Sequence, residues 1–148
     1  MKLYDFSRAP NARRVRMFAA EKGIDIEIIP VDLNIGEQMH EGFQGINSRL
    51  QVPAMVLDDG TLITESVAIC RYLDELYRDP PLFGIGAVGK AKVEMWHRRA
   101  ELEGLQPTAD AVRNSVDFFK NRALSGAVDF EQIPALAERG LRRIDLFH

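Results

Sequence analysis

Over its first half the chain alternates between short apolar runs and polar breaks that mark individual elements. An apolar segment, Lys2–Phe6 (KLYDF), and a β-branched run, Ile24–Val31 (IDIEIIPV), predict two strands. Between them, apolar residues on one helical face of Ala12–Lys22 predict a helix that follows Pro10 and stops at Gly23. Two consecutive strands joined through a helix are expected to be parallel.

A hairpin and a second helix follow further along. Ala54–Leu57 and the residues around Leu62-Ile63 predict two antiparallel strands, because the Asp59-Gly60 step between them can take the positive φ that a tight turn needs. After Glu65-Ser66 the apolar period changes from two to about 3.6, which predicts a helix. The resulting order of strands and helices is the thioredoxin-like α/β topology.

Two stretches without periodicity interrupt this order. Asp32–Leu50 is polar and irregular, with one helical turn expected near Met39–Phe43. Tyr77–Gly89 (YRDPPLFGIGAVG) contains two prolines and three glycines and is predicted to be a linker. We therefore expect a thioredoxin-like domain over residues 1–80 and an all-helical domain over residues 87–148.

The second half of the chain carries apolar residues at helical spacing. A long helix is predicted over residues 87–105, continuing past Pro107 with a kink. Further helices are predicted at about residues 109–123 and over residues 131–147. The last helix has an apolar face with no later segment to cover it, so we expect the helical domain to be incomplete at its C-terminal end.

Composition narrows the classes of function. The chain is 46% hydrophobic with a net charge of −3, which argues against nucleic acid as the main partner. The basic cluster Arg13-Arg14-Arg16 is interpreted as a solvated helix face. A single cysteine, Cys70, excludes an internal disulfide and fits a reducing cytoplasm, where it is expected to act as a small core residue. No signal peptide, membrane span or metal-ligand spacing is visible, so we expect a cytoplasmic protein without a metal site.

The start of the first predicted helix suggests thiol chemistry without a thiol of its own. Dithiol proteins of this topology place a Cys-x-x-Cys pair there, whereas this chain has Ala9-Pro10-Asn11-Ala12. The helix start still offers N–H groups and a positive dipole end, which favour a bound thiolate. The thiol is therefore expected to belong to the substrate, and glutathione is the obvious candidate.

Residues 1–77 resemble the N-terminal domain of bacterial and phi-, theta- or nu-like glutathione transferases. The likeness rests on the whole set QVPAMVLDDGTLITESVAICRYL together with the preceding strand, helix and strand. It implies that Pro53 is a cis-proline that turns the Val52 backbone toward the cysteinyl part of glutathione. It further implies that Glu65 and Ser66 bind the γ-glutamyl end, and that Gln51 reaches the glycyl end.

This chain departs from the pattern at the catalytic position. The catalytic serine of phi-like relatives corresponds to Ala9, which has no donor, while Asn11 matches the asparagine of nu-like members. The group that steadies the thiolate is therefore Asn11, Ser7, Tyr4 or backbone N–H groups. We favour Asn11 because it lies at the helix start, with Ser7 second.

The glycyl subsite departs as well, because the histidine of phi-like members is Gln38 here, with His40 two residues later. The resemblance implies a homodimeric glutathione transferase that joins the thiolate to a hydrophobic electrophile, with no nucleic-acid or membrane partner. Two alternatives stay open: a glutathione-dependent isomerase, although the Ser-Ser-Cys run of maleylacetoacetate isomerases is absent, and a non-catalytic interaction module of the same fold. Helical domains of this family normally extend further, so the chain is expected to be part of a longer protein.

Overall fold

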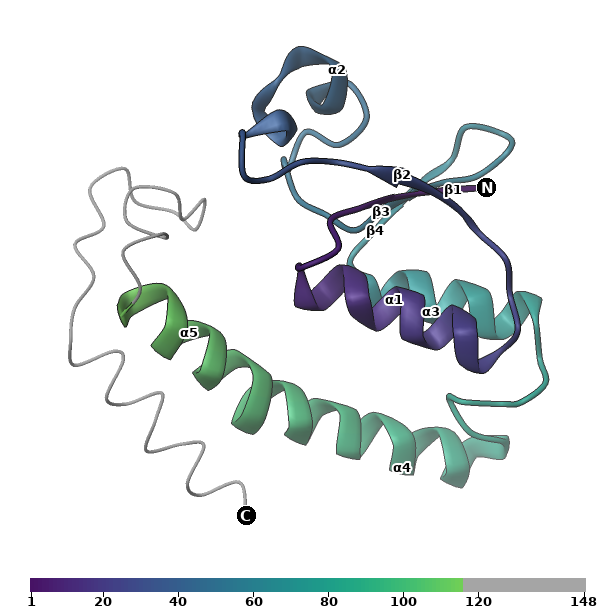
Figure 1. Ribbon diagram of the computed structural model, residues 1–148. Helices are drawn as coiled ribbons and strands as arrows, with labels where there is room; N and C mark the ends of the chain where they lie inside the picture. Colours follow the sequence, from purple (N-terminus) through teal and green to yellow (C-terminus); the bar gives the residue numbers. More distant parts are fainter. Residues whose placement is uncertain (116–148) are drawn as a thin grey trace. The chain divides into compact units, whose positions relative to one another are not determined.

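The computed structural model describes residues 1–115, and the chain divides into two compact units between Phe83 and Gly84. Figure 1 follows the elements along the chain. The first unit contains β1 (Lys2–Asp5), α1 (Pro10–Glu21), β2 (Glu27–Pro30), the short 3-10 helix η1 (Glu37–Met39), α2 (Glu41–Gln44), β3 (Ala54–Val56), β4 (Leu62–Thr64) and α3 (Ser66–Leu76). The described part of the second unit contains α4 (Gly86–Arg99), the π-helical segment η2 (Ala100–Leu105) and α5 (Gln106–Ser115).

The four strands form one mixed sheet in the order β2-β1-β3-β4. Strand β1 is parallel to β2 and antiparallel to β3, and β3 pairs with β4 as a hairpin. Leu3 lies at the centre, opposite Ile28 on one side and Met55 on the other. The predicted parallel pair, hairpin and thioredoxin-like topology are therefore confirmed.

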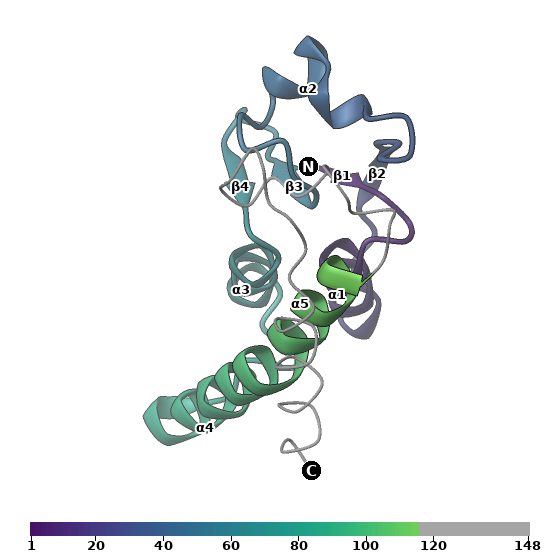
Figure 2. The same ribbon diagram turned by 90° about the vertical axis from the view of Figure 1, so that its left-hand side faces the viewer.

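Side chains alternate between the two faces of β1 and so define what covers each face. Leu3 and Asp5 are buried on the same face, whereas the ring of Tyr4 lies 6.0 Å from that of Phe43, in α2. Figure 2 shows α1 and α3 together on one side of the sheet and α2 on the other. The core between the sheet, α1 and α3 contains side chains with no exposed surface: Leu3, Val15, Met55, Ile69 and Leu73. Burying an aliphatic side chain of this kind contributes about 1.5–3 kcal/mol.

Strand β2 is shorter than the alternation predicts. Only Glu27–Pro30 pair with β1, although the whole run Ile24–Val31 is rich in β-branched residues. Ile26 is buried and packs with the core, and Ile24 packs against it from its edge. The two isoleucines therefore pack against the core without taking part in the pairing of β2 with β1.

The predicted turns have the expected backbone. Gly60 has φ +85° in the hairpin, a conformation that side-chain-bearing residues rarely adopt, and Asp59 accepts a hydrogen bond from the amide of Thr61 at 2.8 Å. The Val52-Pro53 peptide bond is cis, as the resemblance implies. The helical turn expected near Met39–Phe43 is represented by η1 and α2.

The segment after α3 is held to the first unit by a lysine from the end of α1. The Nζ of Lys22 lies 2.7 Å from an oxygen of Asp74 and donates to the carbonyls of Tyr77 and Pro80, each at 2.6 Å. Asp74 also accepts from the amide of Phe83 at 3.3 Å. This contact set fixes most of the predicted linker onto α1 and α3.

The second unit is helical from Gly86, so the last residues of the predicted linker are already in α4. The predicted continuation past Pro107 is present: η2 leads directly into α5, whose first turn contains this proline. Proline lacks the N–H that an α-helix interior requires, which explains a widened turn just before it. Helix α5 begins at Gln106, earlier than expected, and the helix predicted over residues 131–147 lies outside the described residues.

No helix within residues 1–115 combines the length and apolar character needed to cross a membrane. In the same part of the chain, no three His, Cys, Asp or Glu side chains are grouped so that they could hold a metal ion.

Candidate functional site

A pocket opens where the loop before β3, the end of β4 and the first turns of α1 and α3 meet. The residues that line it are Asn11, Asn47, Arg49, Gln51, Val52, Pro53, Thr64, Glu65 and Ser66. Six of the eight site residues proposed from the sequence therefore share one pocket. The other two, Ser7 and Gln38, do not line it.

The loop before Pro53 is shaped by a buried asparagine. Asn47 is 2% exposed; its side-chain amide donates to the carbonyl of Gln51 at 2.8 Å and accepts from the amide of Arg49 at 3.0 Å. These bonds close the loop on itself, so that Gln51 and Val52 are presented to the pocket from a fixed backbone. Sequence reasoning missed Asn47, because an asparagine in an irregular polar loop gives no signal of its own burial.

Backbone strain is concentrated beside this pocket. Within residues 1–115, the non-glycine residues with positive φ are Leu50 (+57°) and Glu65 (+66°). Such conformations cost about 1–3 kcal/mol each and persist where the surrounding structure holds them, commonly at binding sites. Glu65 takes the position just before α3 without capping the helix, and its exposed carboxylate lies 3.8 Å from Nε of Arg49.

Arg14 connects α1 to the start of α3 at the pocket. Its Nη1 donates to the Ser66 hydroxyl at 2.6 Å and lies 3.4 Å from the Asn11 side-chain oxygen. Ser66 itself is only 6% exposed. The guanidinium thus brings positive charge next to two predicted ligand-binding residues.

The expectation that the basic cluster is a solvated helix face is wrong for two of its three members. Arg13 is exposed, whereas Arg14 and Arg16 are half-buried and bound to other elements. Arg16 contacts the buried carboxylate of Asp5 and donates to the carbonyl of Ser7 at 2.8 Å. Spacing along one helix does not reveal these bonds, because both arginines reach partners that are distant in the sequence.

The first turn of α1 approaches the pocket through Asn11. No side chain caps this helix, Pro10 occupies its first position, and an α-helix leaves its first N–H groups without partners inside the helix. Ser7 is exposed on the preceding loop. Tyr4 lies on the face of the sheet that α2 covers, opposite the face covered by α1 and α3. Asn11 is therefore the side chain among these three that the fold brings to the pocket.

Comparisons with known proteins identify relatives of this chain. The family model described as glutathione S-transferase, N-terminal domain, matches residues 9–76. Glutathione S-transferase Z1 of Arabidopsis thaliana is 42% identical over 107 residues, which is 72% of this chain and 48% of the relative. Mouse maleylacetoacetate isomerase is 41% identical over 95 residues, or 63% of this chain and 44% of the relative.

A solved structure supports the same assignment. A glutathione S-transferase domain-containing protein from Marinobacter aquaeolei VT8 superposes with a TM-score of 0.87 at 29% identity, covering 99% of this chain and 70% of that one. The chain belongs to the glutathione S-transferase superfamily. It spans about half the length of the two sequence relatives named above.

Two residues of this glutathione S-transferase family member lie away from the pocket. Gln38 is in η1; its side-chain oxygen is buried and has no hydrogen-bond partner in the part of the chain that the structure describes. His40, two residues later, is exposed. Gln51, which the resemblance implies for the glycyl end, lines the pocket, and so does Arg49, which the sequence analysis did not name.

The single cysteine is not available as a nucleophile. Cys70 is 2% exposed in α3, and burial raises the pKa of its thiol to about 12, with Arg14 opposing the shift. Since the thiolate is the reactive form, this thiol is inert at neutral pH. A thiol that reacts in this pocket has to come from a ligand.

Proposed function

We propose that the pocket binds glutathione and that the chain is the glutathione-binding part of a glutathione-dependent transferase. The observation that carries this proposal is the meeting of the Val52-Pro53 turn, the Glu65 carboxylate and Ser66 at the start of α3 in one pocket. An amino-acid head group needs a carboxylate for its ammonium and N–H or hydroxyl donors for its own carboxylate. Glu65 and Ser66 with the first turn of α3 supply that combination.

The remaining contacts follow the length of the tripeptide. The Val52 backbone would pair with the cysteinyl unit, and Gln51 would reach the glycyl end. The sulfur would then lie toward the first turn of α1, where Asn11 lines the pocket. Free N–H groups, a positive helix end and an amide donor all favour the thiolate over the thiol.

The proposed reaction is attack of the thiolate on an electrophilic carbon of a hydrophobic molecule. A carbon–sulfur bond forms, and the bond to a leaving group such as a halide breaks, so that the halide departs into solvent with the electron pair. Lowering the thiol pKa from about 8.5 toward neutrality raises the thiolate fraction, and each unit corresponds to ~1.4 kcal/mol. The chain's residues contribute binding, orientation and this shift, while the sulfur comes from glutathione. We further propose that the protein acts as a cytoplasmic homodimer.

Three measurements test this function on the protein as it stands. Calorimetric titration with glutathione tests binding, and the ultraviolet absorbance of the bound thiolate against pH tests activation. Conjugation of glutathione to chlorodinitrobenzene then tests the reaction class. Absence of binding at millimolar glutathione would exclude the proposal, whereas binding without conjugation would favour the non-catalytic interaction module.

An isomerase that uses glutathione as a cofactor is the second candidate. It is favoured by the identity to maleylacetoacetate isomerases, 41% for the mouse enzyme and 36% for that of Pseudomonas aeruginosa. The Ser-Ser-Cys run of maleylacetoacetate isomerases is absent from this chain, which argues for the transferase. Incubation with maleylacetoacetate separates the two, because an isomerase converts it without consuming glutathione.

A further inference from the structure

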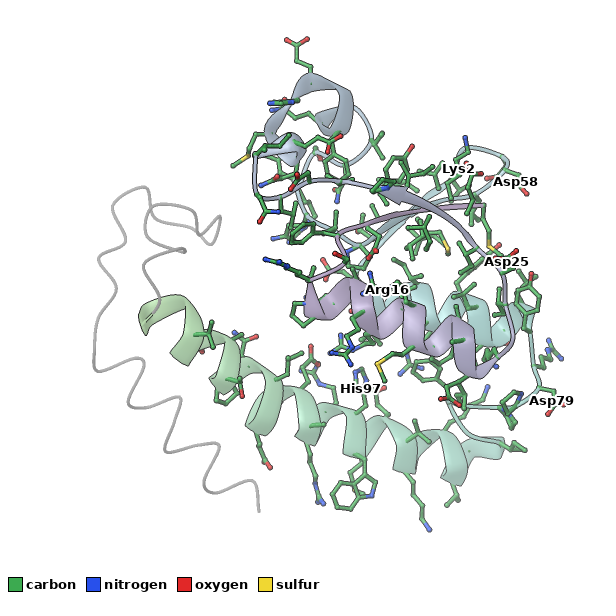
Figure 3. The ribbon with its side chains drawn as sticks, in the orientation of Figure 1. Lys2, Arg16, Asp25, Asp58, Asp79 and His97 are labelled. Carbon is green, nitrogen blue, oxygen red and sulfur yellow. The ribbon has the colours of Figure 1, made fainter. Side chains whose placement is uncertain are left out.

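A charged pair between β1 and α1 remains outside the proposed pocket. Asp5, the last residue of β1, is 4% exposed and points to the same face of the sheet as the core residue Leu3. Arg16, labelled in Figure 3, lies in the second turn of α1. It contacts one oxygen of Asp5 through Nη1. The other oxygen of Asp5 has no hydrogen-bond partner within residues 1–115.

The same guanidinium also holds the loop between the two elements. Its Nη2 donates to the carbonyl of Ser7 at 2.8 Å, so one planar group is bonded to the strand end and to the loop at once. The loop has a second internal bond, from the amide of Ala9 to the carbonyl of Phe6 at 2.9 Å. These two contacts determine how the chain enters α1 and therefore where the first N–H groups of that helix point.

Such a pair is a poor way to gain stability alone. Removing two charges from water is costly, and apolar residues of similar size often stabilise a core equally well or better. An apolar pair could not, however, bond to the backbone carbonyl of the loop. The chemistry specific to this arginine is thus the contact to Ser7, with Asp5 holding the guanidinium in place.

We propose that Arg16, oriented by Asp5, is a positioning residue that sets the first turn of α1 for thiolate stabilisation. The inference rests on the proposed function, because it assumes that the glutathione sulfur lies at this turn. Neither residue lines the pocket, so the effect acts through the backbone from Ser7 to Asn11. Loosening this loop should weaken the preference for the thiolate in a protein that still folds and binds glutathione.

Two variants separate the loss of the loop contact from the loss of charge. Arg16→Met removes both bonds but leaves the Asp5 carboxylate buried alone, whereas Asp5→Leu/Arg16→Met removes the pair while leaving its summed charge at zero. Arg13→Met is the matched control, since it deletes the same charge from an exposed position on the same helix. Arg16→Lys keeps a cation that can reach one of the two partners.

The readout is the pKa of glutathione bound to each variant, followed by thiolate absorbance, with thermal unfolding measured alongside. In Asp5→Leu/Arg16→Met we expect that pKa to rise by about 0.5–1 unit, of the order that a helix terminus contributes. In Arg16→Lys the pKa of bound glutathione should rise by less than in the double variant. Arg13→Met should titrate like the unmodified protein. Amide hydrogen exchange from Ser7 to Ala12 should be faster in Arg16→Met and in the double variant, and unchanged in Arg13→Met.

The outcomes distinguish this inference from the function beneath it. If the unmodified protein binds no glutathione, the proposed function fails and the inference fails with it. If it binds glutathione with a lowered thiol pKa that the double variant leaves unchanged, the inference alone is overturned. An equal shift in Arg13→Met would also overturn it, because loss of charge rather than loop position would then explain the effect.

Discussion

Glu65 has a backbone conformation that is unfavourable for any residue with a side chain, and it lies beside the pocket. A glycine would remove the strain but also the carboxylate. The Nε of Arg49 lies 3.8 Å from an oxygen of the Glu65 carboxylate, and both side chains are largely exposed. Exposed ion pairs of this kind contribute about 0–1 kcal/mol to stability. An ammonium group from a ligand can therefore replace that arginine at little cost.

Replacing Glu65 by glutamine should weaken glutathione binding. The change keeps the shape but removes the charge that would pair with the γ-glutamyl ammonium, a loss of about 1.5–3 kcal/mol, or roughly 10- to 150-fold in Kd. Calorimetric titration measures this directly. Glu41→Gln, at an exposed position in α2, is the matched control. Unchanged affinity in Glu65→Gln would remove Glu65 from the site.

The donor to the thiolate is tested by two alanine substitutions. Asn11 lines the pocket whereas Ser7 does not, so Asn11→Ala should raise the pKa of bound glutathione by roughly one unit and Ser7→Ala should leave it in place. Thiolate absorbance against pH gives both values. A shift confined to Ser7→Ala would show that the wrong donor was chosen.

Cys70 should make stability depend on pH in the alkaline range. Its pKa is raised by burial to about 12 from an ordinary value of 9.0, so the folded protein keeps the thiol while the unfolded chain ionises. Stability is therefore fully present below pH 9 and falls as pH rises toward 12, by up to ~1.4 kcal/mol per unit. Urea unfolding at pH 8 and pH 10 should show a smaller loss for Cys70→Ala than for the unmodified protein. Equal losses would indicate that Cys70 ionises freely in the folded state.

At the scale of elements, α1 and α3 are joined at the pocket by a polar contact as well as by their core residues. Arg14 provides it through Ser66, and the same arginine lies near the Asn11 side chain. The two helices that carry the predicted ligand groups are thus connected where those groups are needed. Loss of this contact should change the relative position of the two helices at the pocket more than it changes the packing of their hydrophobic core.

A double-mutant cycle on Arg14→Met and Ser66→Ala measures this connection. A hydrogen bond to a charged group contributes about 1.5–3 kcal/mol, so we expect a coupling free energy of at least ~1 kcal/mol. Urea unfolding of the four proteins supplies the values. Additive effects of the two substitutions would mean that the contact does not hold α1 and α3 together.

At the scale of the whole molecule, the chain divides between Phe83 and Gly84 into two units. Before that boundary, the chain is tied to the first unit by Lys22 and Asp74. The point where the chain leaves the first unit is thus determined by contacts within that unit.

Lys22→Met should release the segment after α3. The substitution removes an ion pair and two bonds to backbone carbonyls, which we expect to lower the free energy of unfolding by about 1.5–3 kcal/mol. Amide exchange at Leu82 and Phe83, both bonded to Asp74, should become faster. Lys2→Met, an exposed lysine on β1, is the control. Unchanged protection of these amides would show that Asp74 holds the segment without the lysine.

Local features of the sequence determine much of this fold without reference to tertiary contacts. Pro10 begins a helix because its φ suits the first helical position, Gly60 allows a tight hairpin, and the change of apolar period after Ser66 marks α3. Six residues predicted for the site line one pocket, and five of them lie between Gln51 and Ser66, where a turn, a hairpin and a helix start bring them close in space.

The tertiary structure decided what depends on distant partners. The roles of Arg14 and Arg16 are set by Ser66 and Asp5, which lie 52 and 11 residues away in the chain, and no local pattern contains that information. The burial of Asn47, whose side chain bonds to Arg49 and Gln51 within its own loop, is likewise not visible in the sequence pattern. The spacing of polar and apolar side chains predicts local structure because it depends on residues that are close along the chain. The role of a buried polar group depends instead on the partners that the fold brings next to it.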